Sequence, residues 1–286
     1  MEFGTDWGLD ARRRDFTINA LYCDMKGSLF DPLAAFEDLK ERRVRFIGDP
    51  DQRLAEDRLR VYRFFRFTAS HGGEIGDEEG LAACKRFSGD LGNLPAERIG
   101  AEMEKIFALP KIAATLAMMT RANVLDLDIG LLSALASYED ITGVPTISAR
   151  LAILLGQMEI DFLRKSWRLS NSICAEAVSV REVAQMMIAG DHFQAAYKYG
   201  RLAYVALPVA AAISNWSNDE YENTRGLWDS MDVPSFPISG NDLLRSGFAQ
   251  GEKLGQALRQ IEAEWVKSGF KLSREQMLEK IKVFLG

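Results

Sequence analysis

The sequence predicts a mainly α protein in which a small α/β segment precedes an all-helical remainder. Short β-prone runs lie on either side of Lys26-Gly27, a pair that is typical of a turn. From about Pro50 onward, apolar residues recur at helical spacing, and the connections carry Gly, Pro, Asn and Asp. The composition is ordinary for a globular protein, and 286 residues can bury several cores.

Within the first segment, four local elements are expected. Asp15 should cap a short helical turn that runs through Leu21, because an Asp carboxylate accepts the free N–H groups of a helix start. The other elements are a hairpin of residues 21–24 and 28–31, a helix near 34–42 and a strand at 44–48. A sheet of so few short strands is marginally stable by itself. We therefore expect this segment to be the last part of a larger domain.

The helical remainder is predicted to begin at Asp49-Pro50-Asp51, where Pro and acidic residues favour a helix start. We expect one continuous helix over 51–70, ended by Gly72-Gly73. Further helices are predicted near 77–87, 96–108, 110–121, 129–136, 146–156, 158–167, 171–189, 191–213, 218–230, 240–246, 251–268 and 273–284.

Charge and composition exclude several classes of protein. The net charge of −6 argues against coating of nucleic acid by bulk charge, although residues 11–66 hold more Arg and Lys than Asp and Glu. The three cysteines and two histidines show neither metal-ligand spacing nor a disulfide framework, so no metal ligands are predicted. The apolar stretch 202–213 is too short to span a bilayer. We expect no membrane partner and, since no signal peptide opens the chain, a cytoplasmic location.

On the expected helix 51–70, Asp57 and Arg60 lie one turn apart and can point at the same object. A carboxylate only accepts hydrogen bonds, and a guanidinium only donates them. Cytosine and adenine carry an amine beside a ring nitrogen, so Asp57 can accept from the amine while Arg60 donates to the nitrogen. Guanine and uracil present a carbonyl and an N–H instead, and each mismatch costs about 1–3 kcal/mol. The alternative is an ordinary surface ion pair.

Four segments, in this order, resemble the motifs of one family. They are residues 13–20, Asp31-Pro32 with 37–39 and 45–48, Glu56-Asp57-Arg58-Leu59-Arg60, and Glu97-Arg98-Ile99 with Glu102 and Lys105. Together they are similar to the class II tRNA nucleotidyltransferases (CCA-adding enzymes) and their bacterial poly(A) polymerase relatives. The similarity is clear over residues 3–110, and residues 236–243 resemble the tail of these enzymes.

The resemblance implies a tRNA 3′-end nucleotidyltransferase that uses CTP and ATP with Mg²⁺. It implies that Glu56, Asp57 and Arg60 select the base, and that Arg14 and Asp15 lie against the sugar or triphosphate. Arg63 is a further candidate for phosphate or ribose contact. The implied domains are a C-terminal remnant of the catalytic head (1–48), a neck (49–112), a helical body (113–233) and a helical tail (234–286).

The tail of these relatives faces the tRNA elbow, so Gly251, Lys253 and Gly255 are candidates for RNA contact. Glycines at a helix start expose N–H groups that suit a phosphate. Close helix packing and turn formation are the alternative role of these glycines.

The sequence also departs from the family pattern. In relatives a Gly-rich loop and an Asp-x-Asp pair precede the second motif, and two-metal transfer needs such carboxylates. Only Glu2, Asp6 and Asp10 precede it here, so we expect most of the head to be missing and this chain alone to be inactive. Ala34-Ala35 replaces a common glycine pair, which should reshape that turn because alanine disfavours positive φ. The alternatives are a poly(A) polymerase relative, a non-catalytic RNA- or nucleotide-binding helical module, and a helical scaffold.

Overall fold

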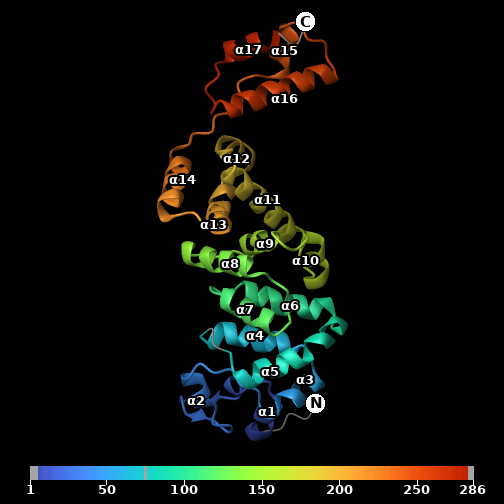
Figure 1. The fold of residues 1–286 in the computed structure, drawn as a ribbon, viewed down its shortest axis with the longest axis vertical. Helices are drawn as coiled ribbons and strands as arrows, with labels where there is room; N and C mark the ends of the chain where they lie inside the picture. Colours follow the sequence, from blue (N-terminus) through green and yellow to red (C-terminus); the bar gives the residue numbers. More distant parts are fainter. Residues whose placement is uncertain (1–5, 74–75, 283–286) are drawn as a thin grey trace. The chain divides into compact units, whose positions relative to one another are not determined.

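The computed structural model describes residues 6–73 and 76–282 (Figure 1). Packing divides the chain into two compact units, Met1–Ser179 and Val180–Gly286. In the described residues the regular structure is almost entirely helical and the sheet has two strands, which confirms the predicted fold class. The predicted domain boundaries near residues 48, 112 and 233 remain predictions.

The elements follow the chain in a simple order. The first unit contains α1 (Trp7–Arg13), η1 (Thr17–Asn19), β1 (Tyr22–Cys23), β2 (Leu29–Phe30), α2 (Ala35–Lys40), α3 (Pro50–Glu56), α4 (Arg60–His71), α5 (Glu78–Phe87), η2 (Ser88–Asn93), α6 (Ala96–Phe107), α7 (Ala113–Arg121), α8 (Ile129–Ile141), α9 (Ile147–Leu154) and α10 (Ile160–Trp167). Helix α11 (Asn171–Ile188) crosses into the second unit, which continues with α12 (His192–Tyr199), α13 (Leu202–Ser214), α14 (Asn218–Ser230), α15 (Gly240–Arg245), α16 (Glu252–Lys267) and α17 (Arg274–Lys282).

The predicted hairpin is confirmed, because β1 and β2 pair antiparallel with Tyr22 opposite Phe30. The prediction of a strand at 44–48 is wrong. Within the residues that the structure describes, this stretch makes only an isolated bridge between Phe46 and Phe16. The Phe46 ring stacks on the Phe64 ring of α4, with ring centroids 5.4 Å apart. Packing onto a helix has therefore replaced pairing with another strand.

Asp15 does not cap the turn η1, contrary to prediction. The residue before the turn is Phe16, which makes no capping hydrogen bond with its side chain. The Asp15 carboxylate accepts hydrogen bonds from Arg60 and Arg63 instead. Hydrogen bonds between two charged groups are roughly twice as strong as neutral ones, so these distant arginines outcompete the local N–H groups.

Ala34 adopts the conformation that the sequence argued against. Its φ is 53°, in the left-handed region, directly before α2. This conformation costs a non-glycine residue about 1–2 kcal/mol. The Asp31 carboxylate offsets part of this cost, because it accepts the N–H groups of Ala35 at 2.8 Å and Phe36 at 2.9 Å. Ala34 therefore takes a left-handed conformation here although it is not a glycine.

The single helix predicted over 51–70 is in fact two helices. Helix α3 ends at Glu56, Asp57 is extended (φ −152°), and α4 begins at Arg60. The Asp57 carboxylate accepts the Leu59 N–H at 3.0 Å. Asp side chains compete with the helical backbone by bonding the N–H two residues on, which explains the break. The apolar face predicted for this segment is confirmed, because Leu54, Val61 and Phe65 are fully buried.

Helices α6 and α10 approach each other closely at Gly100. A Cβ on Gly100 would lie 1.9 Å from the carbonyl oxygen of Trp167. Only glycine permits this distance, so Gly100 sets the spacing of the two helices. The Trp167 ring packs against Phe107 at the other end of α6, with ring centroids 5.4 Å apart.

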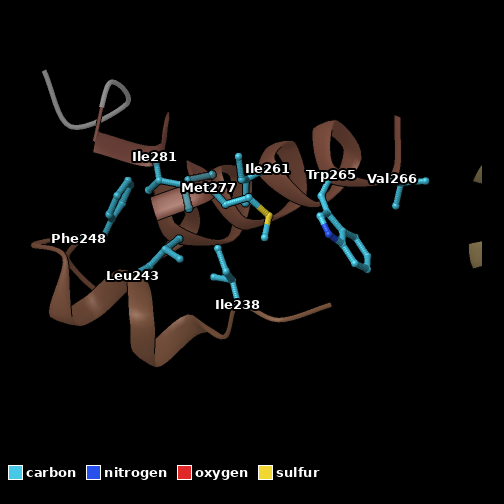
Figure 2. Close-up of a cluster of buried hydrophobic side chains, with 9 residues drawn as sticks. Ile238, Leu243, Phe248, Ile261, Trp265, Val266, Met277 and Ile281 are labelled. Atoms are coloured by element: carbon cyan, nitrogen blue, oxygen red, sulfur yellow. The ribbon is translucent and has the colours of Figure 1, made fainter. Parts of the chain in front are cut away.

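In the second unit, the predicted helix 191–213 divides into α12 and α13 at Gly200, whose φ is 53°. The tail forms its own core, in which Leu243 of α15, Ile261 and Trp265 of α16 and Met277 and Ile281 of α17 are buried together (Figure 2). The hydrophobic pattern of residues 236–281 therefore produces a local cluster. Among the helices of residues 6–73 and 76–282, none combines the length and apolar character needed to cross a membrane.

Candidate nucleotide-binding site

Asp15 is the centre of a charged cluster between the first segment and α4. Its Oδ1 lies 2.8 Å from Arg60 Nε, and its Oδ2 is bound by Arg63 Nε. The Arg60 Nη1 also donates to Glu56 Oε2 at 2.6 Å and to the Arg53 carbonyl at 2.7 Å. The structure thus brings together four of the predicted site residues, Asp15, Glu56, Arg60 and Arg63.

The cluster is well shielded at its centre. The side chains of Asp15 and Arg60 are 12% and 14% exposed, so their attraction is screened less than that of a surface pair. Hydrogen bonds from Arg60 and then Arg53 lower the pKa of Glu56, which keeps this carboxylate ionised at neutral pH. Burial lowers the pKa of Arg60, but the bonds to Glu56 and Asp15 outweigh burial and the net shift is upward.

Asp57 belongs to a second, adjacent contact. Its Oδ2 lies 2.8 Å from Arg98 Nη2, and its Oδ1 accepts the Leu59 N–H. Burial raises the pKa of Asp57, but the bonds from Leu59 and Arg98 outweigh it and the pKa lies below its ordinary value. Asp57 and Arg60 therefore do not form the ion pair that was the alternative to base recognition, since each has other partners.

A polar hollow of about 430 Å³ lies beside Asp57. Its lining residues are Glu56, Asp57, Arg58, Asp90, Asn93 and Leu94. Arg58 closes one side through an ion pair with Asp90 at 3.2 Å. Glu56 and Asp57 thus line a space large enough for a small polar ligand, and Arg60 is not among the residues that line it.

Arg14 lies apart from the cluster. It pairs with Asp10 at 3.0 Å, and its guanidinium stacks over the Tyr22 ring with its carbon 5.3 Å from the centroid. The Tyr22 hydroxyl donates to the same Asp10 carboxylate at 2.8 Å. Arg14 and Asp15 are sequence neighbours, yet the structure directs them to different partners.

Two residues that were not among the predicted site residues, although Arg98 lies in a predicted family motif, support the site. Arg98 holds Asp57, and Arg66 of α4 lies 3.0 Å from Glu102 of α6, which is only 5% exposed. Lys105 reaches the other oxygen of Glu102 at 3.2 Å. The helical spacing of Arg63 and Arg66 places Arg66 on the same side of α4, which is the signal that could have revealed it.

The described residues do not fit a magnesium site. In residues 6–73 and 76–282, no group of three or more His, Cys, Asp or Glu side chains is placed to hold a metal ion. The acids nearest the candidate site, Asp15, Glu56 and Asp57, are each bound by arginine. These carboxylates are therefore already neutralised by arginines of the same cluster.

The candidate RNA contacts lie at the start of α16. Gly251 precedes the helix with a φ of 149°, and added side-chain atoms there would meet open space. Lys253 is exposed, and Gly255 lies on the first turns near the Arg259 guanidinium. The helix start is thus accessible, although the acidic Glu252 also occupies its first turn.

Comparison with known proteins connects this geometry to a family. The model for the poly A polymerase head domain matches residues 1–45, and the model for a probable RNA and SrmB-binding site of polymerase A matches residues 77–127. The mitochondrial CCA tRNA nucleotidyltransferase 1 of Mus musculus is 30% identical over 297 residues, which cover 99% of this chain and 68% of that protein. The chain belongs to the CCA tRNA nucleotidyltransferase family.

Other relatives agree with this assignment. The Homo sapiens CCA tRNA nucleotidyltransferase 1 is 30% identical over 302 residues, with 99% of this chain and 68% of that protein covered. The crystal structure of the Bacillus stearothermophilus CCA-adding enzyme in complex with CTP matches with a TM-score of 0.78 at 24% identity, covering 98% of this chain and 75% of that one. The Thermotoga maritima CCA-adding enzyme complexed with tRNA matches with a TM-score of 0.67 at 19% identity, covering 98% and 74%. These structures establish the fold.

In this member of the CCA tRNA nucleotidyltransferase family, the segments that carry the sequence resemblance converge. Asp15 joins residues 13–20 to α4, and Asp57 joins the α3–α4 break to α6 through Arg98. The motifs are far apart in the sequence, but ion pairs connect them into one site.

Proposed function

We propose that this chain selects CTP and ATP and binds tRNA in the addition of CCA to tRNA 3′ ends. The observation that supports this most directly is the pair Asp57 and Arg60 at the α3–α4 break. Arg98 holds the carboxylate and Asp15 holds the guanidinium, so both groups are oriented before a nucleotide arrives. Preorganised polar groups discriminate between ligands without a cost of reorganisation on binding.

Both groups retain the capacity to read a base. The contacts of Arg60 use Nε and Nη1, and its Nη2 makes no hydrogen bond in the described part of the chain. Each Asp57 oxygen accepts one hydrogen bond, from Leu59 or Arg98, and a carboxylate oxygen can accept a second. A donor and an acceptor thus remain, which matches the ring nitrogen and amine of cytosine or adenine.

The test is a binding titration of the 286-residue chain with CTP, ATP, GTP and UTP. We expect CTP and ATP to bind at least about tenfold more tightly than GTP and UTP, because each mismatched group costs about 1–3 kcal/mol. Arg60→Ala should remove this preference. Arg86→Ala, which alters an exposed pair with Asp51, is the matched control and should retain it. Equal binding of all four nucleotides would contradict the proposal.

The tRNA part of the proposal rests on the accessible start of α16. Gly251, Lys253 and Gly255 would contact an RNA phosphate there. Lys253→Ala should weaken binding to tRNA and reduce the slope of log affinity against log salt by about 1, as expected for one lost phosphate contact. Lys280→Ala, in which the lysine is already paired with Glu264, should leave the slope unchanged.

Magnesium assistance and a cytoplasmic location are further parts of this proposal, on the basis of family and sequence. A second candidate function is poly(A) addition, which the descriptions of the two matched family models favour. Selection of ATP alone, with CTP bound as weakly as UTP, would identify that function.

A further inference from the structure

A second cavity lies in the other unit, between α12 and α16. Its volume is about 520 Å³, within the range of small-molecule sites. Residues of the α11–α12 turn and of α12 form one wall, and α16 forms the opposite wall. None of the residues of the Asp15 cluster contributes to it. The cavity therefore has no role in the proposed selection of CTP and ATP.

Two aromatic side chains form part of the cavity wall and are held in place by neighbouring residues. Phe193 and Tyr197 of α12 line it and pack against the tail core. The Tyr197 hydroxyl donates to Glu262 of α16 at 2.5 Å, and its ring meets Trp265 edge-on at 5.7 Å. A surface of this kind suits a planar ring, because aromatic groups stack with a gain beyond their buried area.

One polar atom at the cavity lacks a partner. His192 lines the cavity, and its buried Nδ1 makes no hydrogen bond within the described residues. The His192 ring is fixed edge-on to Trp228, with centroids 6.4 Å apart. Burial lowers the pKa of His192, so the ring is neutral at pH 7 and offers an acceptor nitrogen. Buried polar atoms are usually satisfied, and a donor group of a ligand in the cavity would satisfy this one.

The outer edge of the cavity carries cations that other residues do not neutralise. Arg259 and Lys267 of α16 are exposed and make no ion pair in residues 6–73 and 76–282. Lys198 also lines the cavity but pairs with Glu182 at 2.8 Å. The lining acids are Glu262, engaged by Tyr197, and Asp191 at the start of α12. Two unpaired cations beside an aromatic wall match a ring that carries a phosphate.

We propose that the cavity between α12 and α16 binds a free nucleoside monophosphate. Its base lies against Phe193 and Tyr197, an amine or N–H of the ligand satisfies His192, and its phosphate meets Arg259 and Lys267. This is a second nucleotide site, separate in residues and in unit from the Asp57–Arg60 pair. It provides a place where nucleotide supply can influence the part of the chain proposed to hold tRNA.

The test is calorimetric titration of the full chain with AMP, carried out in the Arg60→Ala background, which lacks the base preference proposed for the first site. AMP should bind this variant, and adenosine and inorganic phosphate should each bind at least about tenfold more weakly. The double variant Arg259→Ala, Lys267→Ala should lose at least about tenfold in AMP affinity, since two charge-assisted contacts disappear. Arg225→Ala, an exposed arginine of α14, should bind AMP as the background does.

Three results would overturn this second site. They are no AMP binding in the Arg60→Ala background, unchanged binding in the Arg259, Lys267 double variant, and displacement of AMP by tRNA, which would assign the cavity to a nucleotide of RNA. Far-UV circular dichroism of the double variant establishes that α16 is intact. Equal binding of CTP, ATP, GTP and UTP by the unmodified chain, with AMP binding retained, would contradict the proposed function alone.

Discussion

The Arg150 guanidinium donates to the Glu139 carboxylate at 2.6 Å, and both side chains are withdrawn from solvent. This pair joins α9 to α8 and also fixes the connection from α6 to α7. Arg150 also donates to the backbone carbonyls of Phe107, Leu109 and Pro110. Glu139 also accepts the backbone N–H groups of Ile112 and Ala113. Residues that otherwise form an irregular turn are thus held by one buried ion pair.

Breaking this pair should strongly destabilise the first unit. Glu139→Gln is expected to lower the free energy of unfolding by about 3 kcal/mol or more, because it leaves the buried Arg150 charge uncompensated. Urea unfolding followed by circular dichroism measures the change. The neighbouring Asp140 forms an exposed pair with Lys111, so Asp140→Asn should change stability by less than about 1 kcal/mol. Similar losses in the two variants would contradict the buried-pair argument.

The close approach of α6 and α10 predicts opposite effects at two helical glycines. Gly100→Ala should destabilise by about 1–3 kcal/mol or more, because its Cβ would overlap the Trp167 carbonyl and neither backbone can yield easily. Gly226→Ala on α14 meets open space and should stabilise by about 0.5–1 kcal/mol. Thermal unfolding of both variants checks the prediction, which fails if Gly100→Ala melts at or above the parent temperature.

Ala34 supplies a test of backbone strain. Ala34→Gly should stabilise the first unit by about 1 kcal/mol, since glycine adopts its φ of 53° without steric cost. At the next position, Ala35 is fully buried in α2, and Ala35→Gly should destabilise by about 0.5–1 kcal/mol. Paired urea titrations measure both changes. Destabilisation by Ala34→Gly would show that the alanine methyl group matters more than the strain.

The acid stability of the tail should depend on Asp242. Hydrogen bonds from the Ser239 N–H, then the Ser239 hydroxyl, and then Arg274 lower its pKa to about 2. A carboxylate whose pKa falls on folding stabilises the folded state above its ordinary pKa, and this contribution disappears as the pH falls from about 4 to 2. Asp242→Asn should therefore reduce the pH dependence of thermal unfolding in this window. Asp232→Asn, at an exposed position, serves as the control.

Much of the fold could be predicted from local patterns. Helices such as α14 and α16 follow from apolar periodicity, and the hairpin follows from Lys26-Gly27. Two of the errors share one physical cause, since long-range contacts override local preference. Asp15 pairs with arginines of α4 and does not cap the turn, and Phe46 packs on that same helix where a strand at 44–48 was predicted.

The candidate site shows the same limit. Asp57 and Arg60 were identified because their chemistry is complementary to a base. Their actual partners, Arg98 and Asp15, lie about forty residues away in either direction, at separations of 41 and 45. Helical spacing cannot reveal such contacts, because it describes neighbours on one helix only. The break between α3 and α4 depends on a single local hydrogen bond, from the Leu59 N–H to the Asp57 carboxylate.

At the break between α3 and α4, Asp57 has two separate roles. Its carboxylate shapes the joint between two helices, and the same group is the acceptor proposed to recognise a base. Asparagine can form the same local bond to Leu59 but presents an amide that both donates and accepts. An enzyme with asparagine here would keep the joint between α3 and α4 while losing its discrimination between bases. The accuracy of nucleotide selection can therefore be varied at this position without altering the fold.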